Sequence, residues 1–235
     1  MGISVTSGVA LLDYDNTITP AFPAGVAVGD LLVTFVFISA YRAGYPNTPD
    51  GWEPIFNLGT SSDDDRTIAA FYKWFQAGDT APAYIVGSTN VVAGGVCYKC
   101  SGVDAVTPID DSQASLDANT STEHIIGTLT ATAVNGVILA LWGVARLATY
   151  YSDNDSESTP DLTWTEDGDV STLVGTDGSL AYAHTNIFTS TGDVTAIHAH
   201  SFQTGFGAQG GVLLKAAAGI KIPVAMHHYK MAGGL

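Results

Sequence analysis

The sequence contains the same pattern of strands and turns twice, and this repeat constrains the fold more than any other feature. The block Gly29–Phe37 aligns with Asn135–Gly143, and Trp52 aligns with Trp164. Two further pairs of blocks follow in the same order: Thr67–Asp79 with Leu180–Asp193, and Gly94–Cys100 with Gly210–Ala216. The offset between the copies grows from 106 through 112 and 114 to 116 residues, as differences in loop length would produce. We therefore interpret the chain as an internal duplication.

Each copy has the pattern of short β-strands separated by turns. The run Asp30–Ser39 is β-branched, aromatic and apolar at both odd and even positions. This pattern predicts a strand covered on both faces, in the middle of a sandwich or beneath a neighbouring subunit. Further strands are expected at Thr67–Phe75, Gly127–Ala133, Leu180–Thr189 and Val194–Phe202. No stretch keeps an apolar stripe at helical spacing, so the sequence predicts an all-β fold.

The two copies suggest how these strands are arranged. A sheet of four or five strands must cover its apolar face. We expect the halves to cover each other in a jelly-roll-like, two-sheet β-sandwich with both repeated tryptophans near its core. Two side-by-side domains are the alternative. The expected division is an N-terminal edge segment (1–22), a first β half (23–110), a second β half (111–219) and a C-terminal docking tail (220–235).

The charge of the chain excludes several classes of partner. Its 235 residues carry 8 Lys+Arg against 23 Asp+Glu, a formal net charge of -15. Nucleic-acid binding needs a cation for each phosphate contact, and so few dispersed basic residues form no patch for it. An anionic membrane surface would repel the chain as well. The first residues do not resemble a signal peptide, and no apolar run approaches the ~20 residues of a membrane helix. We therefore expect a soluble protein.

The C-terminal segment 220–235 has no counterpart after the first copy. It begins with alternating apolar residues and ends in an aromatic, mildly basic tip, so we expect a docking arm; a disordered terminus is the alternative. The candidate interface residues are Ile220, Ile222, Val224, Met226, His227, His228, Tyr229 and Lys230.

Two pairs of tyrosines occupy equivalent loops, just after the apolar strand of each copy. They are Tyr41 with Tyr45, and Tyr150 with Tyr151. Exposed tyrosines stack on sugar faces or anchor protein interfaces, so these loops are candidate contacts for a glycan or a protein partner. Ordinary loop packing is the alternative interpretation.

The residue types that bind metals or react as nucleophiles point mainly to structural roles. Cys97 and Cys100 have the spacing of a zinc knuckle, but no second pair exists and their counterparts are apolar, so we expect core residues. His198 and His200 share one strand face and would offer two imidazoles, with His184 as a possible third ligand. Hydrogen-bonded histidines or a subunit contact are favoured instead.

The sequence lacks a complete calcium-binding motif and a complete catalytic motif. Asp153–Glu157 and Asp63–Asp65 offer carboxylates, but the glycine turn and distal glutamate of a calcium loop are missing, and solvated acidic turns are favoured. The sequence has no nucleophile elbow, phosphate loop or His-Glu-x-x-His motif. We therefore expect no metal, no cofactor and no enzymatic activity.

Several motifs resemble a domain common among virion proteins of tailed bacteriophages and prophages. They are Pro23–Val33 (Pro-Ala-Gly … Gly-Asp-Leu-Leu-Val), Pro49–Trp52, Phe71–Trp74, Ala77–Tyr84 and Lys99–Asp104. The resemblance covers about residues 20–110, and 135–218 through the repeat. It implies a virion component and carries no catalytic residues.

We therefore expect a non-enzymatic, homo-oligomeric structural protein of a bacteriophage virion, tail- or fibre-associated, in contact with other virion proteins. A capsid decoration or cement protein and a module that binds a host-surface glycan or receptor are the alternatives. A carbohydrate-active enzyme is the least favoured of the functions considered.

Overall fold

The computed structural model describes residues 2–14, 17–39, 46–59, 66–85, 92–145, 150–155, 162–172 and 178–218. These residues form strands and no helix, which confirms the predicted all-β class. The strands are β1 (Ser4–Ser7), β2 (Leu11–Asp13), β3 (Thr17–Ile18), β4 (Leu31–Ser39), β5 (Glu53–Gly59), β6 (Arg66–Trp74), β7 (Tyr84–Ile85), β8 (Val92–Ser101), β9 (Ile109–Leu116), β10 (Ser121–Ala131), β11 (Val137–Ala145), β12 (Tyr150–Asp155), β13 (Trp164–Thr172), β14 (Gly178–Thr185) and β15 (Gly192–Leu214). Among the described residues there is thus no helix long and apolar enough to cross a membrane.

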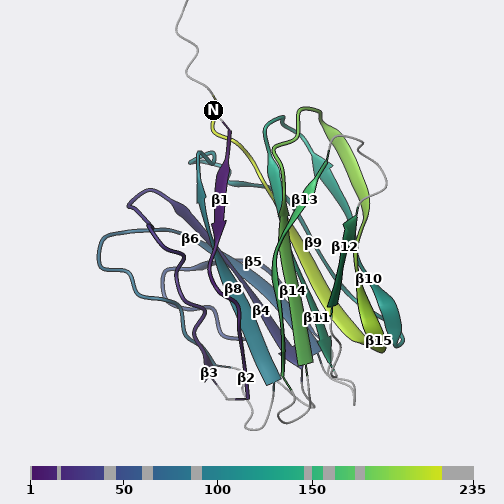
Figure 1. Ribbon diagram of the computed structural model, residues 1–235. Coiled ribbons are helices and arrows are strands. Elements are labelled where there is room, and N and C mark those ends of the chain that lie inside the picture. The colour runs from purple at the N-terminus through teal and green to yellow at the C-terminus, as the bar shows by residue number, and fades with distance from the viewer. Residues whose placement is uncertain are drawn as a thin grey trace, which may run out of the picture.

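Most of the strands belong to two antiparallel sheets that pack face to face as a β-sandwich (Figure 1). The first sheet has the strand order β1-β8-β4-β6-β5, and β2 also pairs with β8. The second has the order β10-β15-β11-β14-β13, and β9 and β12 also pair with β15. β3 and β7 form a separate two-stranded ribbon. The sandwich is as predicted, whereas a jelly-roll connectivity stays a prediction.

The two sheets repeat each other strand by strand. With β4 placed on β11 at an offset of 106, the pairing registers place β6 on β14 and β5 on β13 at an offset of 112. A β-bulge follows Pro54 in β5 and Glu166 in β13, and these positions are equivalent. Trp52 and Trp164 are equivalent as well. Bulges are specific local features, so a bulge at the same place in both sheets supports the duplication.

The registers shift the last block of the repeat by two residues from the alignment based on sequence. Leu31 pairs with Cys100 and Val137 with Leu214, so Cys100 corresponds to Leu214 and not to Ala216. The recurring Gly-Gly-Val string favoured the other alignment. A shift of two residues keeps every side chain on the same face of a strand, so the pattern of burial could not reveal it.

The N-terminal strands also have a counterpart in the second half. β1 and β2 pair with β8 at the edge of the first sheet, where β9 pairs with β15 in the second. Leu12 faces Gly94, and Leu116 faces the equivalent residue Ala208. The segment expected to lie outside the repeat thus occupies the same structural position as β9.

The central core lies between the two sheets and has approximate two-fold symmetry. Its buried residues come from both halves, including Phe35 and Phe37 of β4 and Leu139 and Leu141 of β11. The contacts between the sheets occur in exchanged pairs: β4 packs on β11, β6 on β15 as β14 on β8, and β5 on β9 as β13 on β2. The halves therefore meet as two related subunits of a dimer would.

Two further cores cover the outer faces of the sheets. On the first sheet, Ile18, Phe22 and Tyr84 cover the outer side chains of β4 and β6. On the second, β10 and the first part of β15 fold over the outer side chains of β11 and β14. All nine residues of β4 are buried, which confirms the predicted two-sided cover. This cover comes from the chain itself, so it requires no neighbouring subunit.

The repeated tryptophans lie in these outer cores and not between the sheets. Trp52 is buried in the outer core of the first sheet. Trp164 packs against the outer core of the second sheet, where its ring contacts that of Trp142 edge to face, with centroids 5.9 Å apart. Each tryptophan immediately precedes or begins the edge strand of its sheet, so its side chain reaches around the edge to the outer face.

The two ends of the described chain lie at the same end of the sandwich. Val103 and Ala216 form a β-bridge, and the Ala217 amide donates a hydrogen bond of 2.8 Å to the Gly102 carbonyl. Gly102 in turn lies against the backbone of Gly2. The C-terminal segment 220–235 thus follows a part of the chain that is fixed beside the N-terminus.

Candidate functional site

The predicted interface residues lie largely outside the part of the chain that the structure describes. This holds for the candidate tail residues (Ile220, Ile222, Val224, Met226, His227, His228, Tyr229 and Lys230) and for Tyr41 and Tyr45. The acidic turn Asp63–Asp65, considered for calcium, also lies outside the described residues. The loop predicted at Tyr150 and Tyr151 is wrong: both residues begin strand β12, where they pair with Ser201 and His200 of β15. Of the acidic segment Asp153–Glu157, the first three residues complete β12. Whether these residues form binding surfaces therefore stays a prediction.

Both cysteines are core residues, as predicted. Cys97 belongs to the outer core of the first sheet and Cys100 to the central core, so their thiols lie on opposite faces of β8. Burial raises the pKa of Cys97 to about 12 and also raises the pKa of Cys100 well above its usual range. A thiol must ionise to react or to bind zinc, so neither cysteine is suited to these roles.

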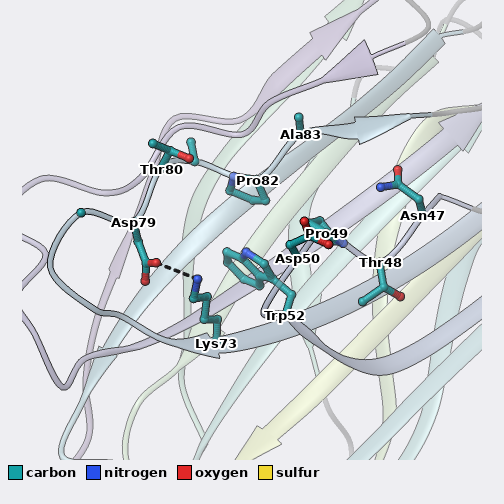
Figure 2. A pocket seen from close by; sticks show the side chains of 12 residues that line it. Asn47, Thr48, Pro49, Asp50, Trp52, Lys73, Asp79, Thr80, Pro82 and Ala83 are labelled. Atoms are coloured by element: carbon teal, nitrogen blue, oxygen red, sulfur yellow. Dashed lines mark hydrogen bonds and ion pairs between the residues drawn. The ribbon is translucent and has the colours of Figure 1, made fainter.

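A pocket of about 450 Å³ opens beside Trp52, at one edge of the first sheet (Figure 2). One wall is the turn Asn47–Asp50, which closes with a hydrogen bond of 3.1 Å from the Trp52 amide to the Pro49 carbonyl. The opposite wall is the loop 78–83. Trp52 is 6% exposed, so it forms an apolar floor and offers little of its ring to a ligand.

An ion pair fixes the loop on the second side of this pocket. Lys73 Nζ of β6 lies 2.7 Å from Asp79 Oδ1, and the other oxygen of Asp79 accepts a hydrogen bond of 2.8 Å from the Gln76 amide. The bond to Lys73, with the one to Gln76, lowers the pKa of Asp79, so this carboxylate stays charged well into the acidic range. The rim thereby presents fixed charges together with the polar groups of Asn47 and Thr80. Such a rim suits a ligand with many hydroxyl groups.

A second polar feature has the order of a catalytic triad. His124 Nδ1 lies 2.6 Å from Asp117 Oδ2, and His124 Nε2 lies 3.0 Å from Ser201 Oγ. This Asp–His–Ser order is that of serine hydrolases. However, His124 has no solvent exposure and Ser201 is 5% exposed, because both face the second sheet from the layer that covers it. A substrate carbonyl has no path to the Ser201 hydroxyl in this state.

Asp117 links segments from both halves of the chain, through its carboxylate and its backbone carbonyl. Asp117 accepts hydrogen bonds from Gln209 Nε2 at 2.7 Å and from the Gly207 amide at 3.1 Å. Its backbone carbonyl accepts a hydrogen bond from Arg66 of the first sheet. Hydrogen bonds between buried polar groups fix the arrangement of the segments that carry them, so we assign the Asp117–His124–Ser201 chain a structural role.

The three histidines considered as metal ligands do not come together as one cluster. His184 lies on β14, and its Nδ1 is 2.8 Å from Asp167 Oδ2 on the neighbouring strand β13. His198 and His200 lie together on β15, and the acidic residue next to them is Glu123 of β10. Sequence reasoning missed Glu123 because only the pairing of β10 with β15 brings it there. It also missed Ser201, which the pairing of β10 with β15 brings near His124, and Asp117, which the pairing of β9 with β15 brings there.

Three comparisons with known proteins found nothing similar to this chain. No family model, no curated protein and no solved structure matches it.

Proposed function

We propose that this chain is a non-enzymatic structural component of a bacteriophage particle, tail- or fibre-associated, which assembles as a homo-oligomer. The proposal starts from the resemblance of the motifs in residues 20–110 to virion proteins. The observation that supports it best is the architecture of three cores in one chain. Both central strands are buried on both faces, so the sandwich is a rigid unit, and its sheet edges and chain ends are left for assembly.

Two details of the sandwich agree with a structural role. In the Asp117–His124–Ser201 chain, both His124 and Ser201 are buried. The two described ends of the chain lie side by side at one end of the sandwich. An adjoining segment with the apolar alternation of residues 220–226 would give a neighbouring subunit a strand to pair with.

Purified particles that carry the gene for this chain provide the test. We expect the protein in the particle, at a few to dozens of copies on the tail by cryo-electron microscopy and mass spectrometry. In solution, light scattering should show an oligomer, which deletion of residues 220–235 dissociates while substitution of the exposed Ile85 by Ser leaves it intact. Hundreds of copies on the head would favour the capsid decoration protein instead. A stable monomer that is absent from particles would contradict both.

The pocket beside Trp52 favours a second candidate function, the binding of a host-surface glycan. Its volume is in the range of small-ligand sites, and its polar rim offers donors and acceptors over an apolar floor. Glycan arrays would test it with the variants Asp50→Ala and Asp79→Ala, and would test the predicted tyrosine contacts with Tyr45→Ala and with Tyr151→Ala on β12. Loss of binding in the aspartate variants alone would assign the glycan to this pocket. Unchanged binding in all four variants would contradict both glycan sites.

A further inference from the structure

We infer that Glu123, His198 and His200 form a binding site for a divalent transition metal, with Zn²⁺ as the preferred ion. The inference begins with the strand register. Successive side chains of a strand point to opposite faces, so His198 and His200 share one face of β15. Ala199 between them is fully buried on the other face. Glu123 of β10 pairs with His200, and residues directly opposite in antiparallel strands share a face. Two strands thus place all three side chains on one outer surface.

The distances between the three side chains fit a single ion. One ligand atom from each residue lies within 4.8 Å of the other two. His198 Nδ1 and Glu123 Oε1 are 4.0 Å apart, and the two imidazole rings have centroids 5.0 Å apart. Ligands bound to zinc at about 2.0–2.1 Å with tetrahedral angles are roughly 3.3 Å apart. Small rotations of three surface side chains would therefore close the site around an ion.

The surroundings combine a firm base with access for the ion. The side chain of His198 is 13% exposed and that of Glu123 is 47% exposed, so the ion can enter from solvent. Beneath them, His124 and Ala199 are fully buried and hold the backbone of β10 and β15 in place. A site on paired strands loses little freedom when it binds, because only side chains need to be ordered.

The donor set selects the class of metal. Two imidazoles and one carboxylate are typical ligands of Zn²⁺, and imidazole also suits Ni²⁺, Co²⁺ and Cu²⁺. Ca²⁺ and Mg²⁺ prefer a full set of oxygen ligands and are not expected here. With three protein ligands, a fourth position is available for water or for a group from another molecule. The bound ion would link β10 to β15 and stabilise the layer that covers the second sheet.

Metal titration of the full chain without an affinity tag would test the inference. We expect one Zn²⁺ per chain by calorimetry, and a visible absorption spectrum of low-symmetry coordination with Co²⁺. Each of Glu123→Gln, His198→Asn and His200→Asn should weaken Zn²⁺ binding at least about tenfold and abolish the rise in unfolding temperature that Zn²⁺ causes. Circular dichroism without metal should be unchanged, because the substituted side chains lie on the outer surface.

Two control variants separate this site from other histidines. The double variant His227→Asn/His228→Asn removes the histidines of the C-terminal segment, and His184→Asn removes the one paired with Asp167. Both variants should bind Zn²⁺ as the native chain does. Zn²⁺ binding that persists in all three site variants, or that disappears only in a control variant, would overturn the inference. Equal binding of Ca²⁺ and Zn²⁺ would overturn it as well.

Discussion

Replacing Gly143 by alanine tests whether the two halves are packed against each other as closely as the structure indicates. Gly143 lies on β11 and faces the ring of Phe37 on β4. A methyl carbon at this position would lie 2.6 Å from Phe37 Cε2 and closer still to Cγ and Cδ2. Ordinary carbon contacts are about 3.5–4.0 Å, so the ring would have to move by roughly 1 Å or more. Phe37 is fully buried, and its neighbours would have to move with it.

Two opposing effects determine how much Gly143→Ala changes the free energy of unfolding. Overpacking of this kind costs about 1–3 kcal/mol. Replacing glycine restricts the unfolded chain, which stabilises the protein by about 0.4–1 kcal/mol where the backbone conformation is ordinary, as it is here. We expect a net loss of about 2 kcal/mol in the free energy of unfolding, or a fall of about 4–8 °C in Tm for a chain of this size. Guanidinium denaturation followed by tryptophan fluorescence would measure it.

A double-mutant cycle assigns this loss to the contact itself. Phe37→Ala alone should cost about 3–5 kcal/mol through the cavity that it leaves. The added methyl group would occupy part of that cavity, so the double variant Gly143→Ala/Phe37→Ala should cost at least about 1 kcal/mol less than the two single variants together. Gly211→Ala is the control, since the atoms nearest to its methyl group would be methyl carbons of Ile126 and Leu129, 3.2 Å or more away. If Gly143→Ala were no more harmful than Gly211→Ala, or if the cycle were additive, the reasoning would be refuted.

Three further substitutions or treatments have expected outcomes. Gly207→Ala should lower the free energy of unfolding by about 1–3 kcal/mol, because its methyl group would overlap the buried carboxylate–imidazole pair; a stability equal to that of the native chain would contradict this. Cys97 and Cys100 should not react with a thiol reagent at pH 8 in the native state, and both should react after denaturation, because burial raises the pKa of each thiol. Asp169 is only partly buried, and this partial burial and the neighbouring Glu166 raise its pKa to about 6. The stability that its protonated form contributes is therefore complete below about pH 4 and lost as the pH rises through 6. Asp169→Asn should remove this slope and stabilise the chain at pH 7, by no more than about 1 kcal/mol because the side chain is largely exposed; an unchanged pH profile would count against it.

Sequence patterns predicted the features that depend on local periodicity. The run from Leu31 to Ser39 is apolar on both parities, and it forms the central strand with a core on each face. The order of the repeated blocks likewise predicted two equivalent sheets. The equivalence of Trp52 and Trp164 follows from sequence spacing alone, although the outer position of both rings does not.

The layer that covers the second sheet could not be predicted in the same way. The sequence predicts a strand at Val194–Phe202 and treats Gly210–Ala216 as a separate block of the repeat, with Gly205 and Gly207 between them. In the structure, β15 continues through these glycines from Gly192 to Leu214. Its two parts are paired with different strands, so the pairing partners, and not the local propensity of glycine, determine its length.

The candidate sites depend on pairing between distant segments. Glu123 reaches His198 and His200 only through the register of β10 with β15, and Ser201 reaches His124 through the fold of the same layer. The pocket at Trp52 joins a turn before β5 to a loop after β6. None of these proximities has a fixed sequence spacing, which is why the sequence predicts the residue types and not their association.

The approximate two-fold symmetry of the halves determines whether one half alone could form the same sandwich as a homodimer. Phe37 and Gly143 are equivalent positions of the repeat, and they meet each other where the two central strands cross. Two copies of the first half joined in the same way would bring one phenylalanine ring onto another. Two copies of the second half would leave a void between two glycines. The single chain thus carries a knob on one half and the matching hole on the other, so neither half alone can rebuild this sandwich as a homodimer.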